Sequence, residues 1–183
     1  MKRRDFFRFG FDKSKEVVGE AVETVLEYKY EREFLRPPGA LPESKFLLVC
    51  TRCGDCQDAC SYGAIHLVGL NGGVRAATPF IDPYYKACEY CEDMSCVKVC
   101  QPGALQAEPN AKLGVARLVQ QHCLVAQGQY CDYCARSCPP GVKAIKMNQQ
   151  RFPEIDQEAC VGCGKCAYIC VSQTGKAITI DPL

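Results

Sequence analysis

The sequence predicts an α+β fold built from four copies of one small unit, in which a short strand, a cysteine loop with a helical turn, and a second short strand follow one another. Two observations carry this prediction. The chain has 16 cysteines in 183 residues, and all of them fall into four compact runs. Short apolar tails that are typical of strands follow these runs, and three runs also have an extended stretch before them. These stretches are PFID at 79–82, VARLV at 115–119 and PEID at 153–156.

Each run contains four cysteines. The first and the fourth have the spacing C-x2-C-x2-C-x3-C, whereas the second opens one gap to four residues and the third opens its first gap to seven. The runs are Cys50, Cys53, Cys56, Cys60; Cys88, Cys91, Cys96, Cys100; Cys123, Cys131, Cys134, Cys138; and Cys160, Cys163, Cys166, Cys170. The tails that follow them are YGAIHLVG, PGALQAE, PPGVKAIKMN and SQTGKAITID.

The spacing of the cysteines indicates iron-sulfur clusters. A cubane has four iron corners that each bind one thiolate, and a C-x2-C-x2-C-x3-C run supplies three of them while its last cysteine binds the cluster of another run. A structural zinc site would need two short cysteine pairs separated by a longer insert, and a disulfide scaffold would be a shorter secreted chain with scattered cysteines. The sequence has neither pattern. It therefore predicts four [4Fe-4S] clusters, with iron bound by all sixteen cysteines.

The charge balance argues against a nucleic-acid partner, and the hydropathy argues against a membrane-spanning helix. Lys plus Arg number 22 and Asp plus Glu number 21, so no basic surplus is present to follow a nucleic-acid backbone. No stretch reaches the roughly 18 apolar residues that a membrane-spanning helix needs. The sequence also lacks a recognisable nucleophile with its general base, so we expect an electron-transfer component rather than an enzyme.

The amino-terminal region differs in kind from the cysteine runs. Residues 14–34 are predicted to form an amphipathic helix, because apolar side chains recur there at helical spacing between glutamates. The apolar positions are Val18, Val22, Val25 and Leu26. RPPGALP at 36–42 ends this helix, because proline cannot continue one. Two interpretations stay open: the helix packs on its own chain, or it docks onto a partner subunit.

The first residues, MKRRDFFRFG, are similar to a twin-arginine export signal, with Arg3 and Arg4 ahead of Phe6 and Phe7. A working signal continues into an uncharged apolar segment, whereas here a charged residue falls every three or four positions. We therefore expect a cytoplasmic protein, with periplasmic export as the alternative.

From about Arg36 to Asp181 the chain resembles the four-cluster ferredoxin-like proteins of the NapG/MauM type, which are related to electron-transfer subunits of molybdopterin oxidoreductases. The resemblance rests on RPPGALPE ahead of the first run, on the open second run CEYCEDMSCVKVCQPGAL, and on the third run ending in CDYCARSCPP. The chain departs from the family at its front and at Ser61 and Val171, where a proline commonly follows the fourth cysteine. The resemblance implies tandem bacterial-ferredoxin-like modules with two [4Fe-4S] clusters each, made of short hairpins and helical turns.

The resemblance also implies a nested pairing of the runs, the first with the fourth and the second with the third. The ligand sets are then Cys50, Cys53, Cys56 and Cys170; Cys160, Cys163, Cys166 and Cys60; Cys88, Cys91, Cys96 and Cys138; and Cys123, Cys131, Cys134 and Cys100. Residues 1–43 are predicted to form a helical arm with a proline-rich linker, and on the nested pairing residues 44–183 form a core of two modules. One module of the core consists of 44–70 with 150–183, and the other of 78–148. Sequential pairing, the first run with the second and the third with the fourth, stays open.

The function that follows is a relay of single electrons through four clusters, between a donor and a catalytic oxidoreductase subunit that contains molybdenum or tungsten. The expected partners are that subunit and a donor or acceptor protein, with the amino-terminal helix as a docking element. Two alternatives stay open: a freely diffusing polyferredoxin that shuttles electrons, and an accessory or maturation protein for a metallocofactor enzyme.

Overall fold

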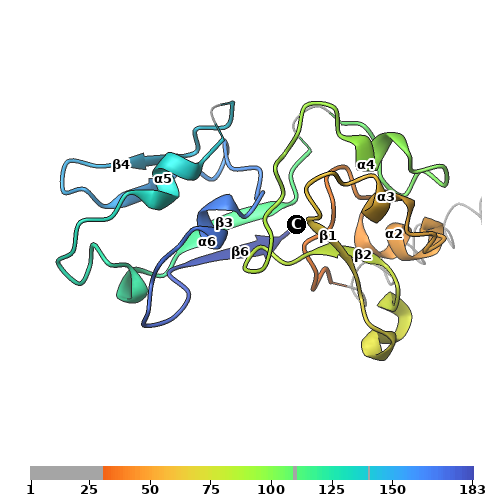
Figure 1. The fold of residues 1–183 in the computed structure, drawn as a ribbon, viewed down its shortest axis with the longest axis horizontal. Coiled ribbons are helices and arrows are strands. Elements are labelled where there is room, and N and C mark those ends of the chain that lie inside the picture. The colour runs from red at the N-terminus through yellow and green to blue at the C-terminus, as the bar shows by residue number, and fades with distance from the viewer. Residues whose placement is uncertain (1–30, 109–110, 140) are drawn as a thin grey trace, which may run out of the picture.

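The fold consists of two lobes of short helices and two-stranded sheets that lie side by side (Figure 1). In this computed structural model the described residues are 31–108, 111–139 and 141–183. We call residues 31–108 the amino-terminal lobe and residues 111–183 the carboxy-terminal lobe. The chain ends between the two lobes, at the end of the last strand (Figure 1).

Four short helices lie inside the predicted cysteine loops, which confirms the helical turns expected there. They are α3 (Asp55–Asp58), α4 (Ser95–Lys98), α5 (Tyr133–Ser137) and α6 (Lys165–Tyr168). The helix α2 (Glu43–Val49) precedes the first run, and two 3-10 turns, η1 (Leu70–Arg75) and η2 (Gln120–His122), lie in the connections. Gly54 and Gly164, which precede α3 and α6, have left-handed φ angles of +89° and +83°, a conformation that glycine adopts without steric cost.

Six strands form three antiparallel pairs, and each pair lies within one lobe. The strands are β1 (Ile65–Leu67), β2 (Pro79–Ile81), β3 (Gly114–Leu118), β4 (Ile145–Met147), β5 (Pro153–Ile155) and β6 (Ile178–Pro182). Strand β1 pairs with β2, β3 with β6, and β4 with β5. The three extended stretches predicted before the cysteine runs are thus confirmed as β2, β3 and β5, and three of the four predicted tails contain β1, β4 and β6.

The proline-rich segment before the first run is part of the amino-terminal lobe and not a separate linker. Leu35 is buried and forms an antiparallel bridge with Ile81, and Ala40 forms another with Leu105. The predicted boundary at residue 43 therefore cuts through the packed lobe. Residues 31–34 carry no helix, and the rest of the helix predicted at 14–34 lies outside the described residues.

A fully buried arginine holds this segment in place. Arg36 is 0 % exposed, and its guanidinium donates two hydrogen bonds to the carboxylate of Glu43, at 2.5 and 3.0 Å. It also donates to Thr78 Oγ1 at 2.9 Å and to the carbonyl oxygen of Pro79 at 2.8 Å, and it lies 4.7 Å from the ring centre of Phe46. Because a buried charge is costly unless it is paired and hydrogen-bonded, these contacts join the proline-rich segment, α2 and the start of β2.

The apolar core is continuous between the lobes. The larger cluster of buried side chains is centred in the amino-terminal lobe, around Phe46 and Ile81, and it includes Val161 and Cys163 from the carboxy-terminal lobe. A second, smaller cluster packs around Ala116 and Ile178. In the described ranges, no helix is both long enough and apolar enough to cross a membrane.

Candidate functional site

The structure gathers the sixteen thiols into four groups. All of them lie in described residues and none forms a disulfide bond. In each group, three thiols come from one run and the fourth is the last cysteine of the neighbouring run. We name these groups sites A, B, C and D in the order in which they occur along the molecule.

Site A lies under α2 and α3 in the amino-terminal lobe. Its thiols are Cys50, Cys53, Cys56 and Cys100, and Phe46 also lines it. Burial is the main cause that raises the pKa of the Cys56 thiol to about 12, and the neighbouring thiolates, Cys50 first and then Cys100, raise it further.

Site B belongs to the same lobe and is formed by Cys88, Cys91 and Cys96 of the second run, with the Cys60 thiol close enough to act on Cys96. Burial raises the pKa of Cys96 to about 11, and the neighbouring Cys91 and Cys60 thiolates add to this effect. Burial also raises the pKa of Cys88 to about 12, with smaller contributions from other thiolates that include Cys96 and Cys91. Helices α3 and α4, which carry thiols of sites A and B, contact each other.

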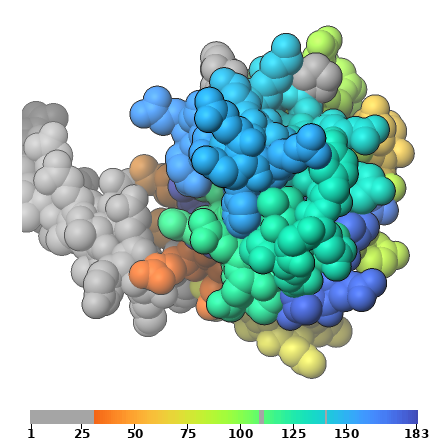
Figure 2. Space-filling view, turned by 90° about the vertical axis from the view of Figure 1, so that its left-hand side faces the viewer, coloured from red at the N-terminus to blue at the C-terminus, as the bar shows by residue number. Residues whose placement is uncertain are grey.

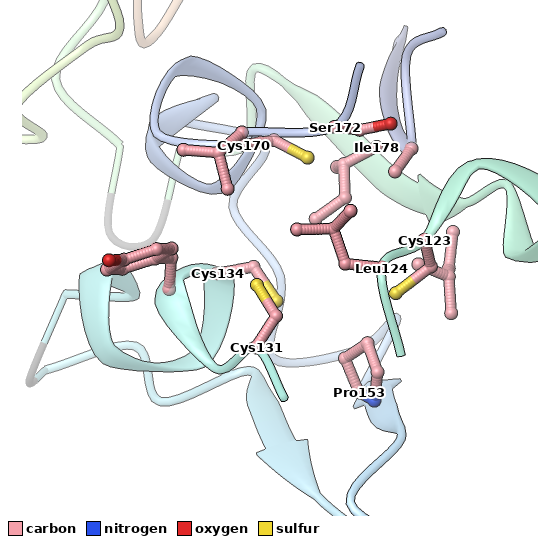
Figure 3. Close-up of a pocket in the computed structure, with 12 residues that line it drawn as sticks. Cys123, Leu124, Cys131, Cys134, Pro153, Cys170, Ser172 and Ile178 are labelled. Atoms are coloured by element: carbon pink, nitrogen blue, oxygen red, sulfur yellow. The ribbon is translucent and has the colours of Figure 1, made fainter. Parts of the chain in front are cut away.

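Sites C and D are the corresponding pair in the carboxy-terminal lobe. Site C is lined by Cys138, Cys160, Cys163 and Cys166. Site D is lined by Cys123, Cys131, Cys134 and Cys170. In Figure 3 the sulfur atoms of these last four side chains face a shared space, with Pro153 and Ile178 at its edge.

These groups are not the nested sets that the family resemblance implied. Cys170 lies with the third run in site D and not with Cys50, and Cys100 lies with the first run in site A and not with Cys123. In the same way, Cys60 lies with the second run in site B, and Cys138 lies with the fourth run in site C. The physical reason is that the strands pair within each lobe, which folds the first run against the second and the third against the fourth. The arrangement is the sequential one that the sequence left open.

Direct contacts place the four sites in sequence: α3 of site A contacts α4 of site B, Cys88 of site B is hydrogen-bonded to Cys163 of site C, and α6 of site C contacts α5 of site D. Burial is the main cause of each raised thiol pKa, and a thiolate of the neighbouring site raises it further. Cys96 of site B acts in this way on Cys56 of site A, and Cys163 of site C acts on Cys88 of site B. Cys134 of site D acts on Cys166 of site C. Each site therefore lies close to the next, in the order A, B, C, D.

The donor set fits cubane clusters. Eight of the sixteen thiols are buried, and burial together with thiolate repulsion disfavours their charged form unless a metal compensates it. Backbone amides also point at the sulfurs of the exchanged cysteines: Ala64 donates to Cys60 Sγ at 3.4 Å, Leu105 to Cys100 Sγ at 3.3 Å, and Ala144 to Cys138 Sγ at 3.2 Å. Hydrogen bonds of this kind stabilise cluster thiolates and tune cluster potentials.

The described residues form no comparable site for a single metal ion. Among them, no group of three or more His, Cys, Asp or Glu side chains is placed so that it could hold one ion. A cubane places a different demand on its site, because each of its four irons takes one thiolate.

The sequence did not reveal Phe46, which lines site A, or Arg36, which packs behind it. Phe46 lines site A and stacks against the buried Arg36, and both precede the first cysteine. The sequence contains a sign of this packing, because the apolar residues of α2 directly follow RPPGALPE at 36–43. A charged residue in that stretch did not suggest burial, because arginine is rarely buried without a partner.

Comparison with known proteins agrees with this chemistry. The model of a 4Fe-4S binding domain matches residues 152–174. The ferredoxin-type protein NapG of Escherichia coli (strain K12) is 42 % identical over 164 residues, which cover 81 % of this chain and 71 % of the relative. The methylamine utilization ferredoxin-type protein MauM of Paracoccus denitrificans is 38 % identical over 149 residues, which cover 75 % of this chain and 66 % of the relative.

A more distant relative is the ferredoxin-type protein NapF of Escherichia coli (strain K12), which is 27 % identical over 138 residues and is covered to 79 % of its length. No solved structure matches the chain. The identity to NapG extends over most of both chains. The chain therefore belongs to the family of NapG- and MauM-type ferredoxin-type proteins.

Proposed function

We propose that this chain holds four [4Fe-4S] clusters, one at each of sites A to D, and relays single electrons along that line. The observation that carries the proposal is that each site gathers four thiols, three from one run and the fourth from the neighbouring run. Such crossed ligation is the pattern of two-cluster ferredoxins. Each lobe is then one two-cluster module, with A and B in the first and C and D in the second.

The chain supplies the positions and the surroundings of the clusters. A bound cubane takes up and releases one electron. The inner thiols Cys88 and Cys163 are each 8 % exposed, so the thiols at the contact between the two middle sites are buried. The ends are more open. Cys53 of site A is exposed, and Tyr133 and Val171, which line site D, are each 47 % exposed.

Two open ends suit two partners. The end at site D faces the viewer in Figure 2, which looks onto the carboxy-terminal lobe from its outer side. We assign one end to an electron donor and the other to a catalytic oxidoreductase subunit that contains molybdenum or tungsten. We further propose residues 1–30 as the element that docks onto that subunit, and the cytoplasm as the compartment.

The test is anaerobic purification of the full chain from its native host, followed by iron and sulfide analysis and identification of the proteins that accompany it. The proposal expects about 16 irons per chain and a copurified oxidoreductase subunit. A chain without residues 1–30 should keep its iron and lose the partner. Zinc in place of iron would overturn the proposal.

The same preparation separates the other two roles. A chain that carries all its iron, is monomeric, and still delivers electrons after removal of residues 1–30 would be a diffusing shuttle. A Cys91→Ala variant that still supports the activity of the partner would instead indicate an accessory role, because that variant interrupts the line at site B.

A further inference from the structure

The two inner sites meet at a direct backbone contact between the lobes. The amide nitrogen of Cys88, a thiol residue of site B, donates a hydrogen bond of 2.9 Å to the carbonyl oxygen of Cys163, a thiol residue of site C. Both side chains are buried and both belong to the larger core cluster. A continuous path of covalent bonds and one hydrogen bond thus joins the two sulfurs.

A glycine permits the lobes to approach this closely. Gly164 follows Cys163 and has a left-handed φ of +83°, and a Cβ atom added there would lie 2.5 Å from Cβ and 3.3 Å from Cα of Pro83. Pro83 is buried and its ring cannot swing away. Any side chain larger than hydrogen at position 164 would therefore push the lobes apart next to the Cys88–Cys163 bond.

An ion pair lies across the same contact. Lys165, which follows Gly164, pairs with Glu89, which follows Cys88. The side chains are 24 % and 35 % exposed, because they border a groove of about 880 Å³ that opens between the lobes. Solvent in this groove can reach the contact if the lobes separate.

We propose that this junction, formed by Cys88, Glu89, Pro83 and the segment 163–165, is the conducting contact between the two halves of the relay. The inference rests on the proposed function, because it requires clusters at sites B and C. The Cys88–Cys163 hydrogen bond carries the electronic coupling. Gly164 and the Glu89–Lys165 pair are positioning residues that hold the lobes at the distance this bond requires.

The physical argument is the steep loss of electronic coupling with distance. An electron passes between two buried sites faster through bonded atoms than across a gap of the same length, and a hydrogen bond replaces the largest gap in this path. One transfer removes one electron from site B and adds one to site C, or the reverse, with no proton moved and no bond broken. The driving force is the potential difference set by the donor and the acceptor.

The test compares Gly164→Ala with Gly54→Ala in the full, iron-loaded chain. The two glycines occupy equivalent places before α6 and α3 and have nearly the same φ, so alanine imposes the same backbone strain on both. They differ in surroundings, since a Cβ at position 54 would meet nothing within 4 Å. Both glycines line a site, so the Gly54→Ala variant controls for the backbone strain and for a methyl group beside a site, and it lacks the clash with Pro83.

Two readouts are needed. Hydrogen exchange of the Cys88 amide should be about tenfold faster in Gly164→Ala, because overpacking opens the local bond. The spin–spin interaction between the reduced clusters of sites B and C, measured by electron paramagnetic resonance, should weaken. Both readouts should be unchanged in Gly54→Ala.

A second pair of variants covers the case in which Gly164→Ala loses iron. Glu89→Gln keeps the shape of the side chain and removes the ion pair, whereas Glu92→Gln changes a nearby exposed residue for which the described residues show no ion pair. Glu89→Gln should speed exchange of the Cys88 amide and weaken the spin–spin interaction at full iron content, and Glu92→Gln should do neither.

The outcomes separate this inference from the proposed function. A wild-type chain without about 16 irons would overturn the relay itself. Full iron content, with Cys88 exchange and spin–spin interaction unchanged in Gly164→Ala, would overturn the junction and leave the relay standing. If Gly164→Ala loses its iron, unchanged readouts in Glu89→Gln would overturn the junction in the same way.

Discussion

Cys170, the last cysteine of the fourth run, lies in the same cavity as Cys123, the first cysteine of the third run (Figure 3). The equivalent relationship in the amino-terminal lobe joins Cys100 to Cys50. Each lobe therefore contains every thiol that its two sites need. In the relay proposed above, an electron that leaves one lobe crosses to the other at the Cys88–Cys163 contact.

Pairs of cysteine substitutions should separate this arrangement from the nested one. Cys53→Ala with Cys100→Ala removes two thiols from site A, so we expect three intact cubanes and about 12 irons per chain. Cys53→Ala with Cys170→Ala damages sites A and D, so we expect only two intact cubanes. Iron analysis with spin integration of the reduced protein counts them. The reverse result, two intact cubanes in the first variant and three in the second, would restore the nested pairing.

Removal of the clusters should unfold both lobes. The lobes are small, and small domains often depend on metals for stability. Their cores contain buried cysteines from separate segments, which a bound cluster would cross-link and which lose that link when iron is removed. Treatment with a chelator and an oxidant should abolish the circular dichroism of the strand pairs and the cooperative unfolding transition. An iron-free, reduced chain that still unfolds cooperatively would contradict this prediction.

Glu43→Gln should destabilise the amino-terminal lobe strongly. The substitution leaves Arg36 fully buried without its carboxylate partner, a loss that typically costs about 3–5 kcal/mol. Glu33→Gln is the control, because the Glu33 side chain is 64 % exposed and its pair with Arg75 is of the surface kind that contributes below about 1 kcal/mol. The stability of both variants is measured as the concentration of guanidinium chloride, in the absence of air, at which the cluster absorbance is lost. Equal midpoints for the two variants would show that the buried pair does not stabilise the lobe.

Gly39→Ala should be more harmful than Gly103→Ala. The φ angles are +73° and +75°, so both variants carry the same left-handed strain, about 1–2 kcal/mol. At position 39 the new Cβ would also lie 1.9 Å from the carbonyl oxygen of Gln106, whereas at position 103 nothing lies within 4 Å. The clash should break the Gln106 N–H bond to the Gly39 carbonyl. Thermal unfolding followed by circular dichroism should show the larger loss at position 39.

Much of the local structure was predictable from the sequence. The stretches PFID, VARLV and PEID are strands, as expected for short segments with apolar and β-branched residues between turn residues. The helical turns inside the runs follow from the cysteine spacing, which brings three thiols to one loop. The four cysteine runs predict four sites without reference to any other part of the chain.

Other parts of the fold could not be found in this way. The burial of Arg36 depends on Glu43 and Thr78 at once, and these residues are brought together only when α2 packs against the start of β2. The same packing places the proline-rich segment inside the lobe. Composition suggested a linker, because prolines and a charge are more often found at the surface than in a core.

The sequence by itself determined that the chain has four sets of three thiols, and with them its iron-sulfur chemistry, because three ligands of each site are spaced by a few residues. The tertiary structure alone decided which run provides each fourth thiol, and therefore the order of the sites. Cys170 has the same local surroundings in sequence whether it joins Cys50 or Cys123. The choice depends on the pairing of strands within each lobe, which is a contact between distant segments and leaves no mark in the spacing.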